Sequence, residues 1–537
     1  MNTPLIRVLL ITCLLLPSYL RVAGQEKMVK QDSITISQDT NKVEIVSADR
    51  LTLLKIDDTT TIQILAGHVR LRQGKALFNC DSCVLNNGAN IFEAWRNIQI
   101  KDGDSIQVNA RHLRYLIDKK IAYLDGGVSL NDRKAVLTTP SLEYNINTDI
   151  GIYTEGGKVV NKKTTLTSKE GYYYASLKEV YFKNEVKLVD PAYRITTDSL
   201  LYNTATQTNR FIAKTIIVDS NGRRIETQDG YYKGGKAEFN QRPVIIDGAT
   251  TITGDRIAFD DSTGTSQAIG NVVVIDTAQG TTLVTGQLYR DDKNERMLAT
   301  GKPLLIVKQD YDSLYLTADT IFTAMQLTPK HKDTTQVKQP ARISLTKKDS
   351  TLRYVEAFHH VRIFSDSLQA VCDSLYYSDR DSVFRLFREP VLWSKESQIT
   401  GDTIWLFTKN KKADRLAVFE NSLIVNEVEP GIYNQVGSIR MEGRFTEGAL
   451  DSVRAFGNAA TIYFLQDEDS SYTGINESKS DFIDIYFIKQ ALDRIVLRGT
   501  VTGTVWPIQQ KNPGEMQLPL FKWNEARRPK SRLDLLQ

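Results

Sequence analysis

Cys80 and Cys83 have the spacing that comes nearest to a chemical motif, because a Cys-x-x-Cys pair can bind a metal or carry redox chemistry. A zinc site would need a second Cys or His pair at similar spacing. The segment that begins at Cys80 aligns with Cys372-Asp-Ser-Leu375, a regular copy of the repeat described below. Since Cys packs well as a small buried residue, we interpret Cys80 and Cys83 as structural. A local disulfide is compatible with this, and a metal or redox site is the alternative.

The other residues that could support catalysis form no recognisable constellation. The five histidines have neither HExxH nor zinc spacing; they are His68, His112, His331, His359 and His360. A Gly-x-Ser-x-Gly elbow and a Walker A loop are absent from the sequence. Carboxylates are plentiful, but no pair of them stands out. The sequence therefore predicts a protein that is not an enzyme, with no catalytic residue, no metal and no cofactor.

The first 24 residues have the pattern of a secretory signal peptide. Arg7 supplies the positive charge, residues 8–16 form a short apolar segment, and Val22-Ala23-Gly24 suits a cleavage site. This pattern predicts export to the periplasm, and association with the outer membrane is a further expectation. A lipid anchor at Cys13 and an uncleaved membrane anchor are the alternatives.

The composition is that of a chain able to bury a large core, with 41% hydrophobic residues among 537. Lys and Arg number 68 against 64 Asp and Glu, with no basic block, so we expect no nucleic-acid binding. No segment beyond the signal peptide is apolar for long enough to form a transmembrane helix.

A short strand pattern recurs along the chain and defines its organisation. Its copies are Val69-Arg-Leu71, Ile98-Gln-Ile100, Val128-Ser-Leu130, Val186-Lys-Leu188, Ile216-Ile-Val218, Val244-Ile-Ile246, Val272-Val-Val274, Leu304-Leu-Ile306, Val361-Arg-Ile363, Val391-Leu-Trp393 and Leu423-Ile-Val425. Successive copies lie 28–32 residues apart, except for intervals of 58 and 57 residues that contain a degenerate unit and an insertion. Gly, Asn, His or Pro usually comes just before each copy.

A second pattern in each unit reads apolar-x-small-Asp-x-apolar, often with an aromatic residue two positions later, as in Ile252-Thr-Gly-Asp255-Arg-Ile257-Ala-Phe259. Apolar residues alternate at period two, which favours half-buried strands over helices. One unit is too short to bury its own apolar face, so the units must stack. The sequence predicts an all-β fold, an elongated β-jellyroll or β-solenoid of about thirteen repeats of about 30 residues, with the recurring Asp as a structural turn residue.

The breaks in the repeat predict the division of the chain. We expect a signal peptide (1–24), a disordered N-terminal segment (25–42), a first β-jellyroll repeat block (43–324), a linker or long loop (325–350), a second repeat block (351–500) and an irregular C-terminal tail (501–537).

The inward side chains of the first pattern would line an apolar seam. In a closed stack they only fill the core, whereas two diverging sheets would leave a groove suited to acyl chains, which gain about 0.8 kcal/mol per buried CH₂ group. Sequence alone leaves both readings open. The candidate groove residues are Val69, Leu71, Ile98, Ile100, Val128, Leu130, Val186, Leu188, Ile216, Val218, Val244, Ile246, Val272 and Val274.

The units resemble the G-N-V … I-x-A-D-x-x-x-Y repeats of the OstA-like, or LptA-like, family of periplasmic lipopolysaccharide-transport proteins. Gly126-Gly-Val-Ser-Leu130, Asn271-Val-Val-Val-Ile275 and Ile252 to Phe259 are similar to that motif. The similarity covers residues 43–324 well and residues 352–500 more loosely. The chain departs from the family in having more units than a single-domain bridge protein.

The resemblance implies a twisted, open β-jellyroll that carries lipopolysaccharide between the inner and outer membranes, with the acyl chains inward. It also implies partners, because family members join edge to edge into a continuous bridge and contribute to outer-membrane assembly. A non-catalytic β-solenoid with a surface or structural role is the main alternative, and a β-helix enzyme acting on polysaccharide is a further one.

Both ends of the repeat array are expected to meet OstA-like partners of the inner- and outer-membrane transport machinery. Terminal strands expose unpaired backbone groups that invite a further strand, and here they lie near residues 43–71 and 483–497. Aromatic residues beside Arg527 and Arg528 in the tail are of the types enriched in binding hot spots. A disordered tail is the alternative.

Overall fold

A computed structural model describes residues 42–103, 106–308, 313–325, 352–446, 449–467, 469, 471–488 and 491–536. The predicted signal peptide, the predicted N-terminal segment apart from Lys42, and the predicted linker apart from residue 325 lie outside the described residues, as does His331.

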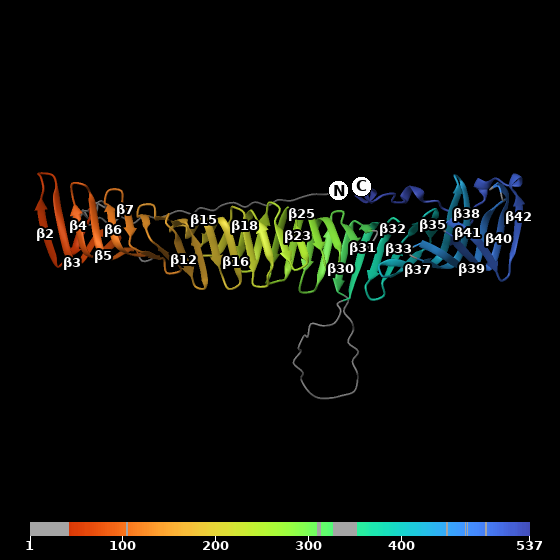
Figure 1. Ribbon diagram of the computed structural model, residues 1–537, viewed down its shortest axis with the longest axis horizontal. Coiled ribbons are helices and arrows are strands. Elements are labelled where there is room, and N and C mark those ends of the chain that lie inside the picture. Colours follow the sequence, from red (N-terminus) through yellow and green to blue (C-terminus); the bar gives the residue numbers. More distant parts are fainter. Residues whose placement is uncertain are drawn as a thin grey trace, which may run out of the picture.

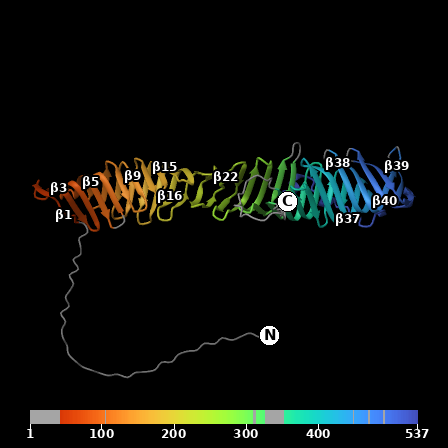
Figure 2. The same cartoon turned by 90° about the horizontal axis from the view of Figure 1, so that it is seen from below.

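The described residues form a long rod of antiparallel β-structure, with the N-terminal strands at one end and the C-terminal strands at the other (Figures 1 and 2). Forty-two strands join into one sheet, and four short 3₁₀ turns follow the last strand. The predicted all-β, elongated jellyroll is confirmed, while the number of repeats stays a prediction. None of the helical turns in the described part of the chain is long and apolar enough to cross a membrane.

The strands before the predicted linker are β1 Glu44–Ser47, β2 Arg50–Lys55, β3 Thr61–Gln73, β4 Ala76–Asn86, β5 Ile91–Asp102, β6 Ile106–Leu116, β7 Ile121–Asp125, β8 Val128–Asn131, β9 Val136–Thr139, β10 Leu142–Asn145, β11 Ile150–Tyr153, β12 Gly157–Asn161, β13 Thr164–Ser168, β14 Glu170–Tyr174, β15 Glu179–Val189, β16 Tyr193–Asn203, β17 Thr208–Phe211, β18 Thr215–Asp219, β19 Arg224–Thr227, β20 Asp229–Lys233, β21 Lys236–Asn240, β22 Val244–Asp247, β23 Thr250–Thr253, β24 Arg256–Asp260, β25 Thr265–Asp276, β26 Thr281–Asp291, β27 Arg296–Thr300, β28 Leu304–Lys308, β29 Ser313–Thr317 and β30 Thr320–Met325.

The remaining elements are β31 Arg353–Phe364, β32 Gln369–Ser378, β33 Val383–Phe387, β34 Val391–Ser394, β35 Ser397–Thr400, β36 Thr403–Lys409, β37 Lys412–Glu429, β38 Ile432–Thr446, β39 Ala449–Gln466, β40 Tyr472–Ile488, β41 Ala491–Arg498, β42 Thr502–Pro507, and the turns η1 Ile508–Gln510, η2 Pro513–Glu515, η3 Glu525–Arg527 and η4 Arg532–Leu536. Because β31 pairs with both β29 and β30, the strand ladder continues from one predicted block into the other.

The chain passes from one half of the sheet to the other at sharp corners, some within a strand and some between two strands. In β3, residues 61–66 pair with β2 and residues 70–72 pair with β1, and the register of the pairing with β4 shifts between Ala66 and Val69. Gly67 and His68 have φ values of 80° and 45°, a left-handed backbone that bends the strand. We call the half of the sheet that contains β2 face A and the half that contains β1 face B. Similar corner pairs recur along the rod at Arg96-Asn97, Gly126-Gly127, Asn184-Glu185, Gln241-Arg242, Gly270-Asn271, Gly301-Lys302, His359-His360, Arg388-Glu389, Glu420-Asn421 and Gly457-Asn458.

The recurring Asp of the second sequence pattern fastens these corners. The backbone N–H of Asp255 donates to the Gly270 carbonyl at 2.8 Å, and its carboxylate accepts from Asn271 Nδ2 at 2.9 Å. A Cβ on Gly270 would overlap the Asp255 carboxylate, which explains the glycine. Asp49, Asp319 and Asp402 make the same pair of contacts at their own corners. The Asp is therefore structural, but it bonds the neighbouring strand instead of its own turn.

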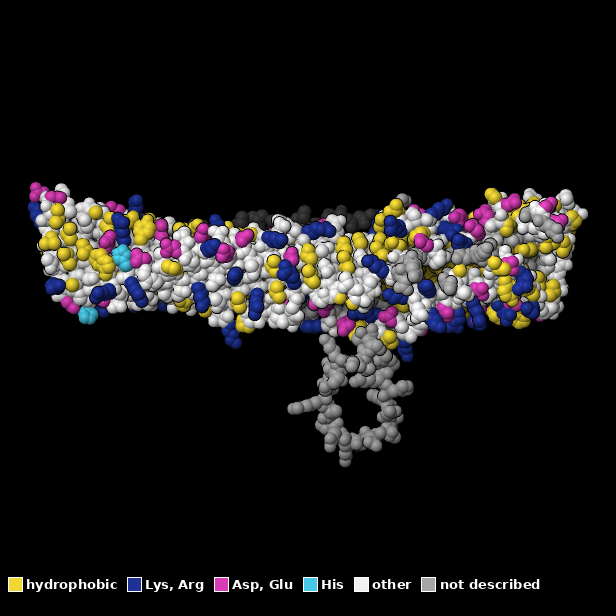
Figure 3. Space-filling view, viewed as in Figure 1, with side chains coloured by type: hydrophobic (Ala, Val, Ile, Leu, Met, Phe, Trp, Pro, Cys, Tyr) yellow, Lys and Arg dark blue, Asp and Glu magenta, His cyan; other side chains and the backbone are white. Residues whose placement is uncertain are grey.

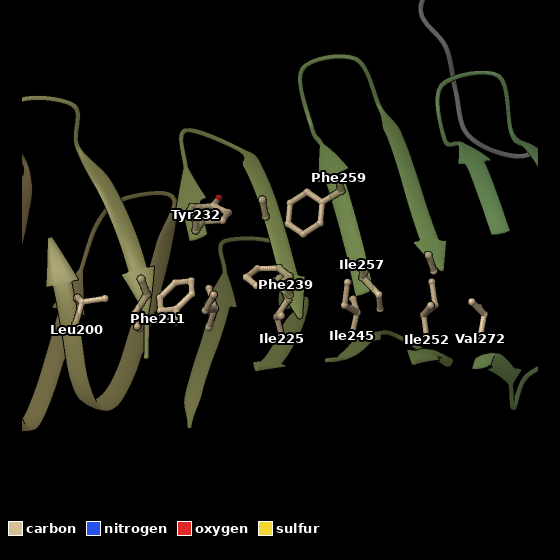
Figure 4. Close-up of a cluster of buried hydrophobic side chains, with 14 of the residues drawn as sticks. Leu200, Phe211, Ile225, Tyr232, Phe239, Ile245, Ile252, Ile257, Phe259 and Val272 are labelled. Atoms are coloured by element: carbon tan, nitrogen blue, oxygen red, sulfur yellow. The ribbon is translucent and has the colours of Figure 1, made fainter. Parts of the chain in front are cut away.

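The space between faces A and B is filled by one continuous apolar core from Leu65 to Phe487. Figure 4 shows part of it, a row of side chains that includes Phe211, Phe239 and Ile257. Tight packing of this kind is usual for protein interiors.

Tyrosines near the hairpin ends of face A reach polar side chains near the hairpin ends of face B. We call this side of the rod, opposite the corners, the mouth. Tyr173 donates to Asp132 Oδ2 at 2.9 Å, Tyr144 donates to Asp102 Oδ2 at 3.3 Å, and Asn161 Nδ2 donates to the Tyr202 hydroxyl at 3.2 Å. Tyr115 and Gln73 make the corresponding bond one unit earlier. Burial raises the pKa of these phenols, so they stay neutral. We call these bonds the clasps.

Replacing Tyr173 with Phe is expected to lower the free energy of unfolding by about 1–3 kcal/mol, because one oxygen of the buried Asp132 carboxylate loses its donor. Chemical denaturation of both proteins measures the difference. Tyr123→Phe, at an exposed position of face A, is the matched control and should change stability by less than about 0.5 kcal/mol. Equal effects of the two substitutions would show that the clasp contributes nothing.

The C-terminal segment, residues 508–536, runs back along the outside of face B over the C-terminal strands (Figure 1); we call it the tail. Two glutamines bind the backbone of the tail, each through the nitrogen and the oxygen of its side-chain amide. Gln398 Nε2 donates to the Lys522 carbonyl and its Oε1 accepts from the Asn524 N–H, each at 2.6 Å. Gln435 binds Met516 and Leu518 in the same way at 2.9 and 2.8 Å.

The tail covers an apolar strip on the outer side of face B. Gln369, Trp393 and Gln398 lie directly opposite one another on neighbouring strands, so they share that side, and Trp393 is fully buried. Further along, Met516 of the tail packs with Ile462, Phe464 and Ile475. Residues 501–537, predicted as an irregular tail, thus contain β42 and four 3₁₀ turns. Their aromatic residues Phe521 and Trp523 lie against Tyr433 of the same chain.

Candidate functional site

Ten of the fourteen candidate groove residues lie in the interior between the two faces, where the sequence pattern puts them. They are Val69, Leu71, Ile98, Ile100, Val128, Leu130, Val186, Leu188, Val272 and Val274. All but Val274 are buried, and Val274 packs against the buried cluster from a half-buried position. Together they form a single apolar row along the N-terminal half of the rod.

The other four, Ile216, Val218, Val244 and Ile246, point out of the interior, so the sequence interpretation is one residue out of step here. Buried Ile217 and Ile245 are the inward residues of these strands. The position equivalent to Val69 holds Thr215 in one unit and buried Pro243 in the other, and neither extends the hydrophobic pattern. The Thr215 hydroxyl is accommodated because it donates to the Ala213 carbonyl at 2.8 Å.

The predicted structural cysteines are buried in the same interior. Cys80 lies opposite Val69, and Cys372 lies opposite Val361 one block later, so the two occupy equivalent positions, as their sequences predict. All three described cysteines are free thiols.

The described histidines sit at or beside the outer side of corners, each with one aspartate. The Nδ1 to carboxylate distances are 2.9 Å for His68 with Asp49, 2.9 Å for His112 with Asp125, 3.0 Å for His359 with Asp373 and 2.8 Å for His360 with Asp319. The hydrogen bond with the Asp49 carboxylate raises the pKa of His68. Within the described ranges, no three His, Cys, Asp or Glu side chains are arranged to hold a metal ion.

A cleft of about 670 Å³ opens at the mouth in the middle of the rod. Three tyrosines and five aspartates line it together with Arg223; they are Tyr193, Tyr202, Tyr232, Asp190, Asp219, Asp247, Asp261 and Asp292. A second hollow of about 60 Å³ shares Arg223 with the cleft and reaches the core residues Ile245, Ile252, Ile257, Phe259 and Leu288. The polar mouth therefore leads into the apolar interior at this place.

Arg223 takes over the position of a clasp in this unit. The next aromatic residue after Tyr232 in the tyrosine series is Phe259, which has no hydroxyl group to bond across the mouth. Arg223 reaches from the hairpin end of face B to Asp261 on face A at 3.1 Å, while also 3.0 Å from Asp219. Its guanidinium lies 4.5 Å from the centre of the Phe259 ring. An ion pair instead of a buried phenol thus crosses the mouth at the cleft.

The N-terminal end of the rod exposes the apolar interior directly. Leu51 lies opposite buried Leu65 and Ile45 lies opposite buried Leu71, so both continue the inward rows, yet they are 49% and 38% exposed. Leu53 is 61% exposed on the same edge. In the described part of the chain, β1 and β2 each pair with β3 alone. Hydrophobic side chains gather at this end of the surface (Figure 3).

Residues 40–198 match a family model that is described as OstA-like protein. The predicted resemblance is confirmed for this part of the chain. A solved structure, LptH of Pseudomonas aeruginosa, is described as the LptA-homologous periplasmic component of the lipopolysaccharide transport device. It is 14% identical to this chain, covers 26% of it and 82% of its own length, and has a TM-score of 0.19. No curated protein matches the sequence.

Two features of the site were not predicted from the sequence. The clasp tyrosines recur at 29-residue spacing in Tyr115, Tyr144, Tyr173 and Tyr202, a signal present in the aromatic position of the second pattern. The Arg223 ion pair has no such signal, because its partners lie on different hairpins and share no periodicity.

Proposed function

We propose that this protein is a non-catalytic carrier of the periplasm that holds the acyl chains of lipopolysaccharide between its two faces and joins other OstA-like jellyrolls. The observation that carries the proposal is the single apolar core from Leu65 to Phe487, which is open at the N-terminal edge and reached by the cleft at Arg223. The OstA-like match of residues 40–198 gives the proposed lipid class.

Physical chemistry supports acyl chains as the cargo. An uninterrupted apolar interior can follow a long hydrocarbon chain, and each buried CH₂ group contributes about 0.8 kcal/mol. No charge would have to enter the core, because the charged residues of the cleft stay at the mouth. The proposed location follows from the signal-peptide pattern of the first 24 residues and from the family match, and outer-membrane association belongs to the same proposal.

The second candidate is a β-rod with a purely structural role. The buried interior side chains and the tyrosine clasps favour it, because both describe a filled core instead of an open groove. The two candidates differ in one respect that can be measured: only the carrier must admit a lipid between the faces.

A photoreactive diazirine analogue of leucine at position 217 or 188 is expected to capture lipopolysaccharide on irradiation, with the same analogue at 216 or 187 capturing at least about tenfold less. Ile217 and Leu188 face the interior, whereas their chain neighbours Ile216 and Lys187 face outward, so each pair differs in side but not in position along the rod. The measurement is the mass shift of the irradiated protein incubated with purified lipopolysaccharide. Equal labelling on both sides, or none, would favour the structural rod.

A further inference from the structure

Cys80 and Cys83 lie on the inner side of one corner, in β4. Cys80 belongs to the face B half of the strand, where it lies opposite Val69, and Cys83 belongs to the face A half, opposite Leu65. Asp81 and Ser82 between them point away from the interior. Both thiols are buried, with 6% and 0% of the residue exposed.

The inner side of a corner brings residues three apart together. The position equivalent to Cys80 always holds a small residue in the neighbouring units, which are Ala110, Thr139, Ser168, Thr197, Thr227 and Thr285. Where that residue has a hydroxyl group, it folds back over the corner and donates to the carbonyl two residues later, at 2.9 Å for Thr139 and 2.7 Å for Ser168. A side chain at the Cys80 position thus points across the corner toward the next residues of the strand. In β4 the equivalent carbonyl is that of Ser82, and the residue after it is Cys83.

The two thiols interact with each other across the corner. Cys80 and Cys83 are hydrogen-bonded to each other, and this contact lowers the pKa of the Cys80 thiol and raises that of Cys83. Cys372, at the equivalent corner, has Leu375 in the place of Cys83, and burial raises its pKa to about 12.

We propose that Cys80 and Cys83 are a redox site that is oxidised to an intramolecular disulfide across the corner of β4. The proposal rests on the exported location in the proposed function, because the periplasm is an oxidising compartment. Cys372 stays a thiol and serves as an internal control, because no second cysteine faces it across its corner.

The oxidant is an incoming disulfide, either oxidised glutathione or the active-site disulfide of a thiol oxidoreductase. The Cys80 thiolate attacks one sulfur of that disulfide and releases the other as a thiol, which leaves a mixed disulfide on Cys80. Cys83 loses its proton and attacks the Cys80 sulfur, which releases the second thiol of the oxidant. Two protein thiols become one disulfide, and the oxidant takes up the two electrons. Since both thiols are buried, the exchange takes place before the strands close over them.

The disulfide would fix the angle between the two faces near the N-terminal end. β4 pairs with β3, and β3 carries the exposed edge strands β1 and β2. The corner of β4 therefore supports the edge at which a further jellyroll would join. The disulfide would close a ring of four residues, from Cys80 to Cys83, and so restrain the opening of this corner.

The test uses the full chain, refolded in glutathione buffers of rising oxidised fraction, then denatured and treated with a maleimide. Peptide mass spectrometry is expected to show Cys80 and Cys83 protected together and Cys372 labelled, with all three labelled after reduction. If Cys80 and Cys83 are labelled to the same extent as Cys372 at every glutathione ratio, the proposed redox site is wrong. A disulfide that includes Cys372 would also contradict it.

Matched variants and a cellular sample complete the test. Cys80→Ser and Cys83→Leu use residues found at the equivalent positions Ser168 and Leu375, so both should fold as judged by circular dichroism. Each is expected to leave the remaining cysteine labelled. Acid-trapped protein from its host should show the pair oxidised, and free thiols there would refute oxidation in the cell. Lipid capture at position 217 is measured independently, so failure of the disulfide and failure of the carrier proposal are distinguishable.

Discussion

Deletion of residues 508–537 is expected to leave the β-rod folded but to make it self-associate. The deletion uncovers the apolar strip on the outer side of face B that includes Val391, Trp393 and Phe464. Each large apolar side chain loses roughly 1.5–3 kcal/mol of burial, so the C-terminal strands should lose more than about 5 kcal/mol in total. Light scattering after gel filtration, dye binding to exposed apolar surface and calorimetry measure the three effects.

A single substitution tests the same contact with less disruption. Gln398→Ala removes both bonds to the tail backbone and should lower the free energy of unfolding by about 1–3 kcal/mol. Gln517→Ala, at an exposed position on the tail itself, is the control and should be nearly neutral. A monomeric, equally stable deletion protein would mean that the tail does not contribute to the fold.

The double substitution Leu51→Lys with Leu53→Lys is expected to reduce capture of an OstA-like jellyroll from the same host by at least about 100-fold. The two residues are 49% and 61% exposed on the terminal strand β2, so folding should be preserved. Lysines on an edge strand oppose strand addition, because pairing would bury their charges. A pull-down with the immobilised partner jellyroll, followed by titration, measures the loss.

The control places the same charges in the middle of the rod. Ile275→Lys with Leu298→Lys changes two outward apolar residues that are 41% and 37% exposed, far from either end. It should bind as the unchanged protein does. A similar loss in both double variants would make the N-terminal joint wrong and would point to a general effect of charge.

The repeat and the strand class could be predicted from the sequence because alternation and spacing are local properties. The side of each strand was harder to predict. Thr215 and Pro243 hold inward positions that a hydrophobic pattern passes over, so the inward row had to be found from the pairing of neighbouring strands. The equivalence of Cys80 and Cys372 could be predicted, because it required only an alignment of two units of the repeat.

The position of the tail could not be predicted from the sequence for a different physical reason. Gln398 and Gln435 bind main-chain atoms, and a main chain has the same hydrogen-bonding groups at every residue. Such contacts leave no complementary pattern of side-chain types in the sequence. The clasps could be predicted in part. The regular spacing of the tyrosines is visible in the sequence, but partners such as Asp132 are recognised only from the three-dimensional arrangement of the two faces.

The corners and the clasps differ in strength, so the corner side of the rod acts as a hinge and the mouth is the side that can open. At a corner such as that of β3, the two faces share a continuous strand that Asp49 fastens further, and this side does not come apart while the protein is folded. Across the mouth, the polar contact in a unit such as that of Tyr144 is one side-chain bond of about 0.5–1.5 kcal/mol. One clasp therefore opens thermally at a free-energy cost of only a few times RT at most, whereas opening the whole length at once would sum every clasp. Opening of the mouth should therefore be local, with the clasp of one unit broken while those of its neighbours remain formed. The open unit should be able to move along the rod.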